Sequence, residues 1–196
     1  MAIRLVVGAL LSGVVLMAWG FVFWMFAPWP KELLRDLPQQ DVVVDVLEKA
    51  DLQTGVYLYP KHGAAGGAAQ DDFTRRRGQG PLLQLFYHRG GAEPMTTRTY
   101  LEGYGQVALA ALLAGIVLAS AGLRSYVARV GLTLFMGLFA VVLVQLGAPI
   151  WFNHPWDYHL MFAGYHLVNA LLIGLVMGAL VKPAVAQLER KPVAER

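Results

Sequence analysis

Long apolar runs alternate with one polar segment along this chain. Residues 5–26 contain no charged side chain, and as a helix they are long enough to cross the roughly 30 Å hydrocarbon core of a bilayer. Three further apolar stretches follow, at residues 104–122, 130–150 and 155–182. This pattern predicts a membrane all-α protein whose core is a four-helix transmembrane bundle.

The first apolar run competes with a secretory signal peptide as an interpretation. It exceeds the usual signal-peptide core of about 7–15 residues, and it ends in aromatic side chains and not at a small-residue cleavage site. Pro28 and Pro30 then end the helix at the interface. Residues 1–26 are therefore expected to be an uncleaved signal anchor.

The polar segment, residues 27–103, predicts a small α+β extracytoplasmic cap between the first two spans. Residues 41–50 can form an amphipathic helix, although their valines leave a strand open as an alternative. Residues 55–59 alternate as a strand does, and residues 82–88 are its expected partner. Glycine and other small residues predict a flexible loop over 62–80. Because the cap is too small for a large core, we expect it to rest on the spans or on a partner protein.

The composition agrees with a membrane protein and excludes several classes of site. Of the 196 residues, 57% are hydrophobic and only 15% are charged, whereas a soluble domain carries about a quarter charged residues. The chain contains no cysteine, which excludes disulfides, thiolate metal sites and a cysteine nucleophile. No basic helix or stripe accompanies the net charge of +3, so nucleic acid is not an expected partner.

The basic residues that flank the short loops predict the topology. Arg4, the connection at residues 124–129 and the tail at residues 183–196 fall on one side when four spans are assumed. Short loops rich in lysine and arginine stay in the cytoplasm, whereas long segments cross largely regardless of charge. We therefore expect both termini in the cytoplasm and residues 27–103 in the periplasm.

The start of the fourth span carries candidate metal ligands. With His154 near the N-cap, Asp157 would occupy the position of a capping-box acid, which is a sufficient structural role. His154, Asp157 and His159 are alternatively candidate ligands of a metal ion at the interface. His159 and His166 are too far apart along a helix to bind one metal ion together.

Two polar residues deeper in this span need a partner inside the membrane. His166 and Asn169 can serve as hydrogen-bonding residues between helices, with Gln145 of the third span as the expected partner. The alternatives are contact with a cofactor, such as an axial bond to haem or a quinone contact, and a proton path. No other predicted span contains a histidine, so an internal bis-histidine haem is not expected.

Two further groups of residues are candidate contacts to a partner or to lipid. Gly174 and Gly178 have the spacing that lets membrane helices approach closely, either within the bundle or against another protein. Arg75, Arg76 and Arg77 form a solvated charge run or contact anionic lipid heads or an acidic partner.

The order of these features is similar to that of a type of small four-span bacterial inner-membrane protein. The shared features are a first span ending near Ala18-Trp19-Gly20, then Leu37-Pro38 before an amphipathic helix, then Gly55-x-Tyr-x-x-Pro60 opening a hairpin, and three more spans. The resemblance implies a bacterial inner-membrane location, and it brings no activity and no functional residue with it.

No catalytic signature is present, and no catalytic residue is assigned. The chain lacks a nucleophile elbow, a zinc-protease motif, a phosphate-binding loop and a dinucleotide fingerprint. The sequence favours a non-catalytic accessory or assembly subunit of a larger membrane protein complex, with membrane lipids and other membrane subunits as partners. A redox protein that holds haem or a metal ion through the fourth-span histidines, and a lipid or small-molecule binding protein, remain alternatives.

Overall fold

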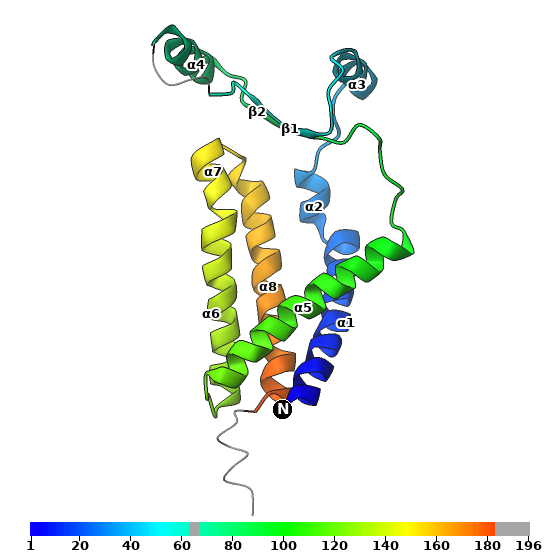
Figure 1. Ribbon diagram of the computed structural model, residues 1–196, viewed down its shortest axis with the longest axis vertical. Coiled ribbons are helices and arrows are strands. Elements are labelled where there is room, and N and C mark those ends of the chain that lie inside the picture. Colours follow the sequence, from blue (N-terminus) through cyan, green and yellow to red (C-terminus); the bar gives the residue numbers. More distant parts are fainter. Residues whose placement is uncertain (63–66, 183–196) are drawn as a thin grey trace, which may run out of the picture. The chain divides into compact units, whose positions relative to one another are not determined.

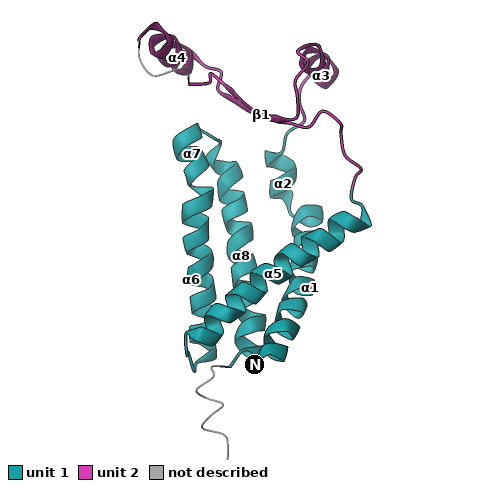
Figure 2. Cartoon of the chain, viewed as in Figure 1, with its two compact units in different colours: residues 1–35, 95–196 teal, residues 36–94 magenta. Residues whose placement is uncertain are grey.

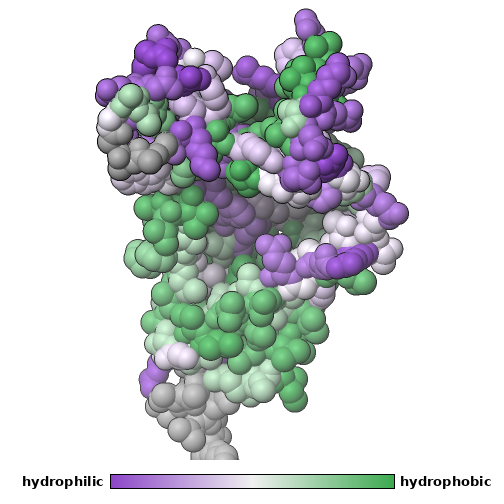
Figure 3. Space-filling model, turned by 45° about the horizontal axis from the view of Figure 1, so that its top comes forward, coloured by the Kyte–Doolittle hydropathy of each residue, from purple (hydrophilic) through white to green (hydrophobic). Residues whose placement is uncertain are grey.

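The computed structural model describes residues 1–62 and 67–182 and divides the chain into two compact units (Figures 1 and 2). The first unit comprises residues 1–35 together with the described residues from Met95 onward. The second unit comprises residues 36–94. On the face seen in Figure 3, hydrophobic side chains dominate the helices of the first unit, and hydrophilic ones dominate the second.

The first unit contains four helical segments that are long and apolar enough to cross a membrane, as the pattern of the sequence predicts. Its helices are α1 (Ala2–Phe26), α2 (Pro28–Leu33), α5 (Thr97–Ser120), α6 (Tyr126–Gln145), α7 (Gly147–Phe152) and α8 (Trp156–Leu180). Helices α6 and α7 together form one of the four segments. Four such segments are consistent with a multi-pass membrane protein.

Helix α8 lies at the centre of this bundle. It packs against α6 on one side and α1 on another, while α5 crosses α1 obliquely and touches α8 more lightly (Figure 1). Met177 of α8 is fully buried between Gly8 of α1 and Gly115 of α5. A Cβ atom on Gly115 would lie 2.1 Å from Met177 Cε, and one on Gly8 would lie 2.7 Å from Met177 Sδ. The small residues therefore create the space that this side chain fills.

Helices α6 and α8 approach through small residues as well. A Cβ atom on Gly137 would lie 2.3 Å from Ala170 Cβ, and one on Gly174 would lie 3.2 Å from Val130 Cα. Near the end of α8, the buried Arg129 of α6 donates from Nε to the Gly178 carbonyl at 2.8 Å. These contacts fix an antiparallel register between the two helices.

The second unit consists of two short helices and one hairpin: α3 (Gln40–Lys49), β1 (Gly55–Tyr59), α4 (Gly67–Gln79) and β2 (Leu83–Tyr87). The strands pair antiparallel with Val56 opposite Phe86, which confirms the pairing predicted from the sequence. The helix expected near residues 41–50 is also present, and the strand alternative there is wrong.

The flexible loop expected over 62–80 is wrong for most of its length, because α4 occupies Gly67–Gln79. Two arginines, Arg75 and Arg76, pair with Asp72 three and four residues before them. Such pairs stabilise a helix, and the alanines beside Gly67 are strong helix formers. These local interactions outweigh the glycine content of the segment.

Replacing Gly137 with alanine is expected to lower the free energy of unfolding by about 1–3 kcal/mol, the usual cost of overpacking a core. The new Cβ would meet Ala170 Cβ, which is attached directly to the backbone of α8, so the two helices must separate. Thermal unfolding in detergent measures the effect. Gly131→Ala on the same helix is the matched control, because no atom lies within 4 Å of its Cβ position. Equal stability of the two variants would refute the close contact.

Candidate functional site

A break in the third membrane segment positions the candidate site. Helix α6 ends at Gln145, and α7 follows from Gly147 to Phe152. Asn153 then adopts the left-handed conformation at a φ of 59°, which asparagine tolerates better than most residues. Pro155 is the N-cap of α8, and its ring fixes the entry of the chain into that helix. This turn brings His154 back over the first turn of α8.

Three polar side chains form a hydrogen-bonded chain at this point, which we call the histidine cluster (Gln145, His154 and His159). Nδ1 of His159 lies 3.2 Å from Oε1 of Gln145, and Nε2 of His159 lies 3.0 Å from Nδ1 of His154. His159 is the buried member, with 8% of its surface exposed. The cluster thus joins the end of α6, the turn and the start of α8.

The roles in the histidine cluster follow from the chemistry of its groups. An amide oxygen only accepts, so in this orientation of Gln145 the Nδ1–H of His159 donates to it. Nε2 of His159 then accepts from Nδ1–H of His154 when both rings are neutral, and donates when His159 is protonated. The two rings can therefore pass one proton between them, or present two nitrogen ligands.

The predicted metal ligands are brought together only in part. The two histidine nitrogens are close enough for two ligands of one ion at the usual bond length of about 2 Å. Asp157 instead accepts the backbone N–H of Tyr158 at 2.8 Å. Among the described residues, no group of three histidines or carboxylates is placed to hold a metal ion. The metal hypothesis stays a prediction that rests on two histidines.

The helix start lies one residue later than the capping-box interpretation requires. Pro155 is the N-cap and His154 precedes it, so Asp157 occupies the second helical position and not the third. An acidic residue in the first turn still complements the positive end of the helix dipole. The structural role of Asp157 is therefore kept, although its capping geometry differs.

Gln145 is the partner of His159, and the expected pairing with His166 is wrong. Gln145 is the last residue of α6, and the antiparallel register places it opposite the first turns of α8. His166 lies between aromatic rings, with centroid distances of 6.2 Å to Phe162 and 5.3 Å to Tyr165. The structure thus assigns His166 aromatic neighbours from its own helix.

Asn169 carries a buried oxygen atom that lacks a hydrogen-bond partner among the described residues. Ser12 Oγ and Trp19 Nε1 share this property. The amide of Asn169 lies in a membrane-length helix, where an unpaired polar atom costs more than it does near water. The cofactor hypothesis for His166 and Asn169, with haem as its main form, stays a prediction.

The remaining candidates are engaged within the chain. Gly174 and Gly178 face α6, where Val130 and Arg129 lie against them, so they serve packing within the bundle, and their contact with a second protein or lipid stays a prediction. Arg75 and Arg76 bind Asp72, and their hydrogen bonds hold the pKa of that carboxyl below its usual range. Both arginines therefore stabilise α4, and the contact of Arg75, Arg76 and Arg77 with lipid or an acidic partner stays a prediction.

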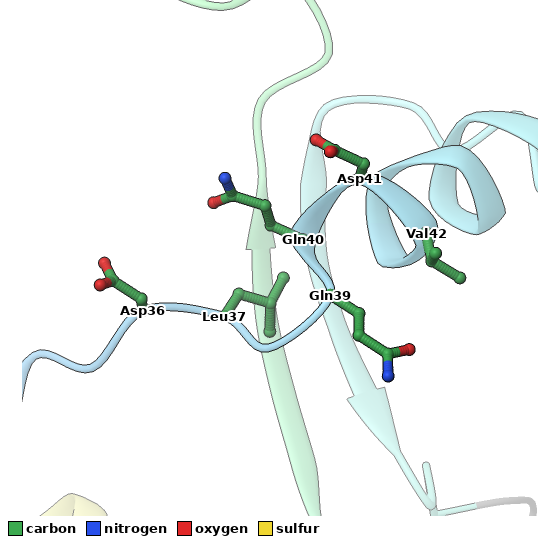
Figure 4. A pocket seen from close by; sticks show the side chains of 6 residues that line it. All are labelled: Asp36, Leu37, Gln39, Gln40, Asp41 and Val42. Atoms are coloured by element: carbon green, nitrogen blue, oxygen red, sulfur yellow. The ribbon is translucent and has the colours of Figure 1, made fainter.

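A groove in the second unit offers no convergent chemistry. Its lining comes from one short stretch of the chain: Asp36, Leu37, Gln39, Gln40, Asp41 and Val42. Figure 4 shows Gln39 pointing away from Gln40 and Asp41. Polar groups that diverge in this way do not define a binding site.

No family model, curated protein or solved structure matches this chain. The geometry alone therefore carries the functional interpretation.

Two features escaped the sequence analysis. Arg129 is buried, and its Nη1 donates to the carbonyls of Leu123 and Arg124, so it closes the turn before α6. Its spacing of four from Thr133, which is also buried, is the signal that could have shown an inward face. A cavity between α1, α2 and α8 was missed because no local pattern predicts that α2 contacts α8.

The hydrogen bond between Gln145 and His159 is expected to give a coupling energy of about 0.6–1.7 kcal/mol, the range found for such bonds between membrane helices. A double-mutant cycle of Gln145→Leu and His159→Leu, with unfolding followed in detergent, measures it. The matched cycle of Gln145→Leu with His166→Leu should give a coupling near zero. A larger coupling to His166 would overturn the assigned pairing.

Proposed function

We propose that this protein is a non-catalytic accessory or assembly subunit of a larger membrane protein complex, and that residues 36–94 bind its partner. The observation that carries the proposal is the absence of a core in this unit. Among residues 36–62 and 67–94, none is buried. A unit of about 60 residues is marginal even when it has a core, so this one needs a surface to cover it.

The hairpin presents a suitable apolar surface. Val56, Leu58 and Phe86 lie on one face of the two strands, since Val56 is paired with Phe86 and side chains two residues apart share a face. We call this set the apolar strand face. Its members are 57%, 42% and 71% exposed, respectively. An isolated two-stranded hairpin is only marginally stable in water and gains most from packing against another element.

The backbone of the hairpin supports the same role. The sheet has two strands, so both are edge strands with hydrogen-bonding groups available on their outer sides. A partner can therefore add a strand to the edge while its apolar side chains cover the strand face. Exposed apolar surface rimmed by polar residues is typical of such docking sites.

We also propose that the protein resides in a bacterial inner membrane with both termini in the cytoplasm and residues 27–103 in the periplasm. The basic flanks support this orientation, with Arg4 in the first turn of α1 and Arg124 between α5 and α6 on the same side as Lys182 after α8. The resemblance in feature order supports the bacterial location. Periplasmic exposure of residues 36–94 makes a periplasmic or membrane-anchored partner the expected one.

Photo-crosslinking tests the docking surface. A photoreactive amino acid at Val56 or Phe86 in native membranes is expected to give a discrete adduct larger than the chain alone, because both side chains are exposed on the apolar strand face. The same amino acid at Val42 of α3, which is 58% exposed, is the matched control and should give much less adduct. Adducts confined to lipid or to this chain would contradict a protein partner at this face.

Reporter fusions test the proposed topology. A reporter active only in the periplasm should be active when fused after residue 70 and inactive at the C-terminus, because basic flanks are retained in the cytoplasm. A reporter active only in the cytoplasm, placed at the same two positions, should give the opposite pattern. The same side for both positions would refute four spans with this orientation.

A further inference from the structure

A cavity of about 580 Å³ lies between α1, α2 and α8, within the first unit. Its volume is in the range of small-molecule sites, about 300–1,000 Å³. Pro28 at the first position of α2 lets the chain turn directly after α1, and α2 contacts α8. The short helix α2 thereby brings Trp29, Glu32 and Leu33 over the cavity.

Aromatic rings form much of the cavity wall. Tyr165 lies 4.7 Å from Phe23 and 6.1 Å from Trp19 between ring centroids, and Trp29 lies 6.5 Å from Phe23. Phe23 is 3% exposed and anchors the group, whereas Trp29 is 55% exposed. The faces of such rings attract organic cations, and aromatic cages recognise ammonium groups.

Two carboxylates, Glu32 and Asp157, line the same cavity. No lysine, arginine or histidine is among its described lining residues, and the ion pairs found in the described chain include neither carboxylate. Both carboxylates are exposed, so a cation can approach them directly and is attracted by their negative charge. The cavity therefore has negative charge at its polar groups and apolar or aromatic surface elsewhere.

We propose that this cavity binds a membrane lipid whose headgroup ends in an ammonium, such as a phosphatidylethanolamine. The ammonium lies between Glu32 and Asp157 and against the aromatic faces, and an acyl chain follows the apolar side chains of α8. The proposal is independent of the partner-binding role of residues 36–94.

The two kinds of lining group exclude other ligand classes. Carboxylates repel an anionic headgroup such as phosphatidylglycerol, which has no ammonium to compensate. The mostly apolar wall gives a small polar solute few hydrogen bonds. A molecule with both a cationic end and a long apolar part fits both kinds of surface. The location in a bundle with four membrane-length helices makes a lipid the expected source of that molecule.

Native mass spectrometry of the full chain in detergent, with defined lipids added, tests the proposal. Wild-type protein is expected to retain phosphatidylethanolamine over phosphatidylglycerol of the same acyl chains by about fivefold, as expected for one exposed ion pair with one cation–π contact. The double variant Glu32→Gln with Asp157→Asn should lower this ratio to near one. Glu102→Gln, which removes a carboxylate paired with Arg98 on α5, is the matched control and should leave the ratio unchanged.

A steric variant separates lipid binding from charge. Gly164 lines the cavity, and no atom lies within 4 Å of its Cβ position, so the side chain of Gly164→Leu starts in open space and adds volume to the cavity wall. Retention of phosphatidylethanolamine should fall severalfold in this variant. Gly131→Leu on α6, which is equally open at its Cβ position, should retain the wild-type level. Circular dichroism and thermal unfolding show whether each variant is folded.

No headgroup preference in the wild type would overturn the proposal, as would a preference that survives the double variant. Preference for the anionic lipid would assign the cavity to a different ligand. Loss of binding in the folded Gly131→Leu variant would show that the retained lipid lies elsewhere on the bundle.

Discussion

The close approach of α8 to its three neighbours is the constraint on which the rest of the bundle depends. Lipid tails are as apolar as leucine, so membrane helices associate through tight packing and hydrogen bonds and not through the hydrophobic effect. Met177 fills the space left by Gly8 and Gly115, while Gly137 and Ala170 bring α6 into contact on the other side. This packing fixes the register that places Gln145 beside His159 and leaves the cavity beside α2.

The two ends of α8 are held by different chemistry. At its start, the ring nitrogens of His159 form hydrogen bonds with Gln145 and His154. The bond between the two histidines forms only while at most one of their rings carries a positive charge. At its end, the guanidinium of Arg129 binds the Gly178 carbonyl, where the helix dipole is negative. Arg129 also donates to the carbonyls of Leu123 and Arg124 in the preceding turn, so all three of its bonds named here have carbonyl oxygen acceptors. A buried arginine is tolerated because these carbonyls solvate it.

The sequence was sufficient where one local pattern dominated. The four membrane-length segments follow from apolar runs, and the hairpin follows from two alternating stretches that end in turn residues. It was insufficient where two signals competed or where register mattered. Glycine and other small residues predicted a loop over residues 62–80, yet residues 67–79 form a helix, which the pairs of Asp72 with Arg75 and Arg76 favour. A similar predicted depth in the membrane suggested His166 as the hydrogen-bond partner of Gln145. The end of α6 at Gln145 and its antiparallel register with α8 instead place His159 beside Gln145.

Exposed apolar surface has opposite meanings in the two units. In a bilayer, lipid would cover exposed side chains of the bundle such as Phe135 and Leu143 without any partner, so their exposure predicts nothing specific. In residues 36–94, water is the alternative solvent, and exposed Phe86 and Val56 cost free energy unless something covers them. The cavity beside α2 presents both polar and apolar surface. Its carboxylates attract a cation, and its apolar walls favour an acyl chain. The proposed partner binding by the hairpin and the proposed lipid binding by the bundle therefore follow from one rule, applied in two solvents.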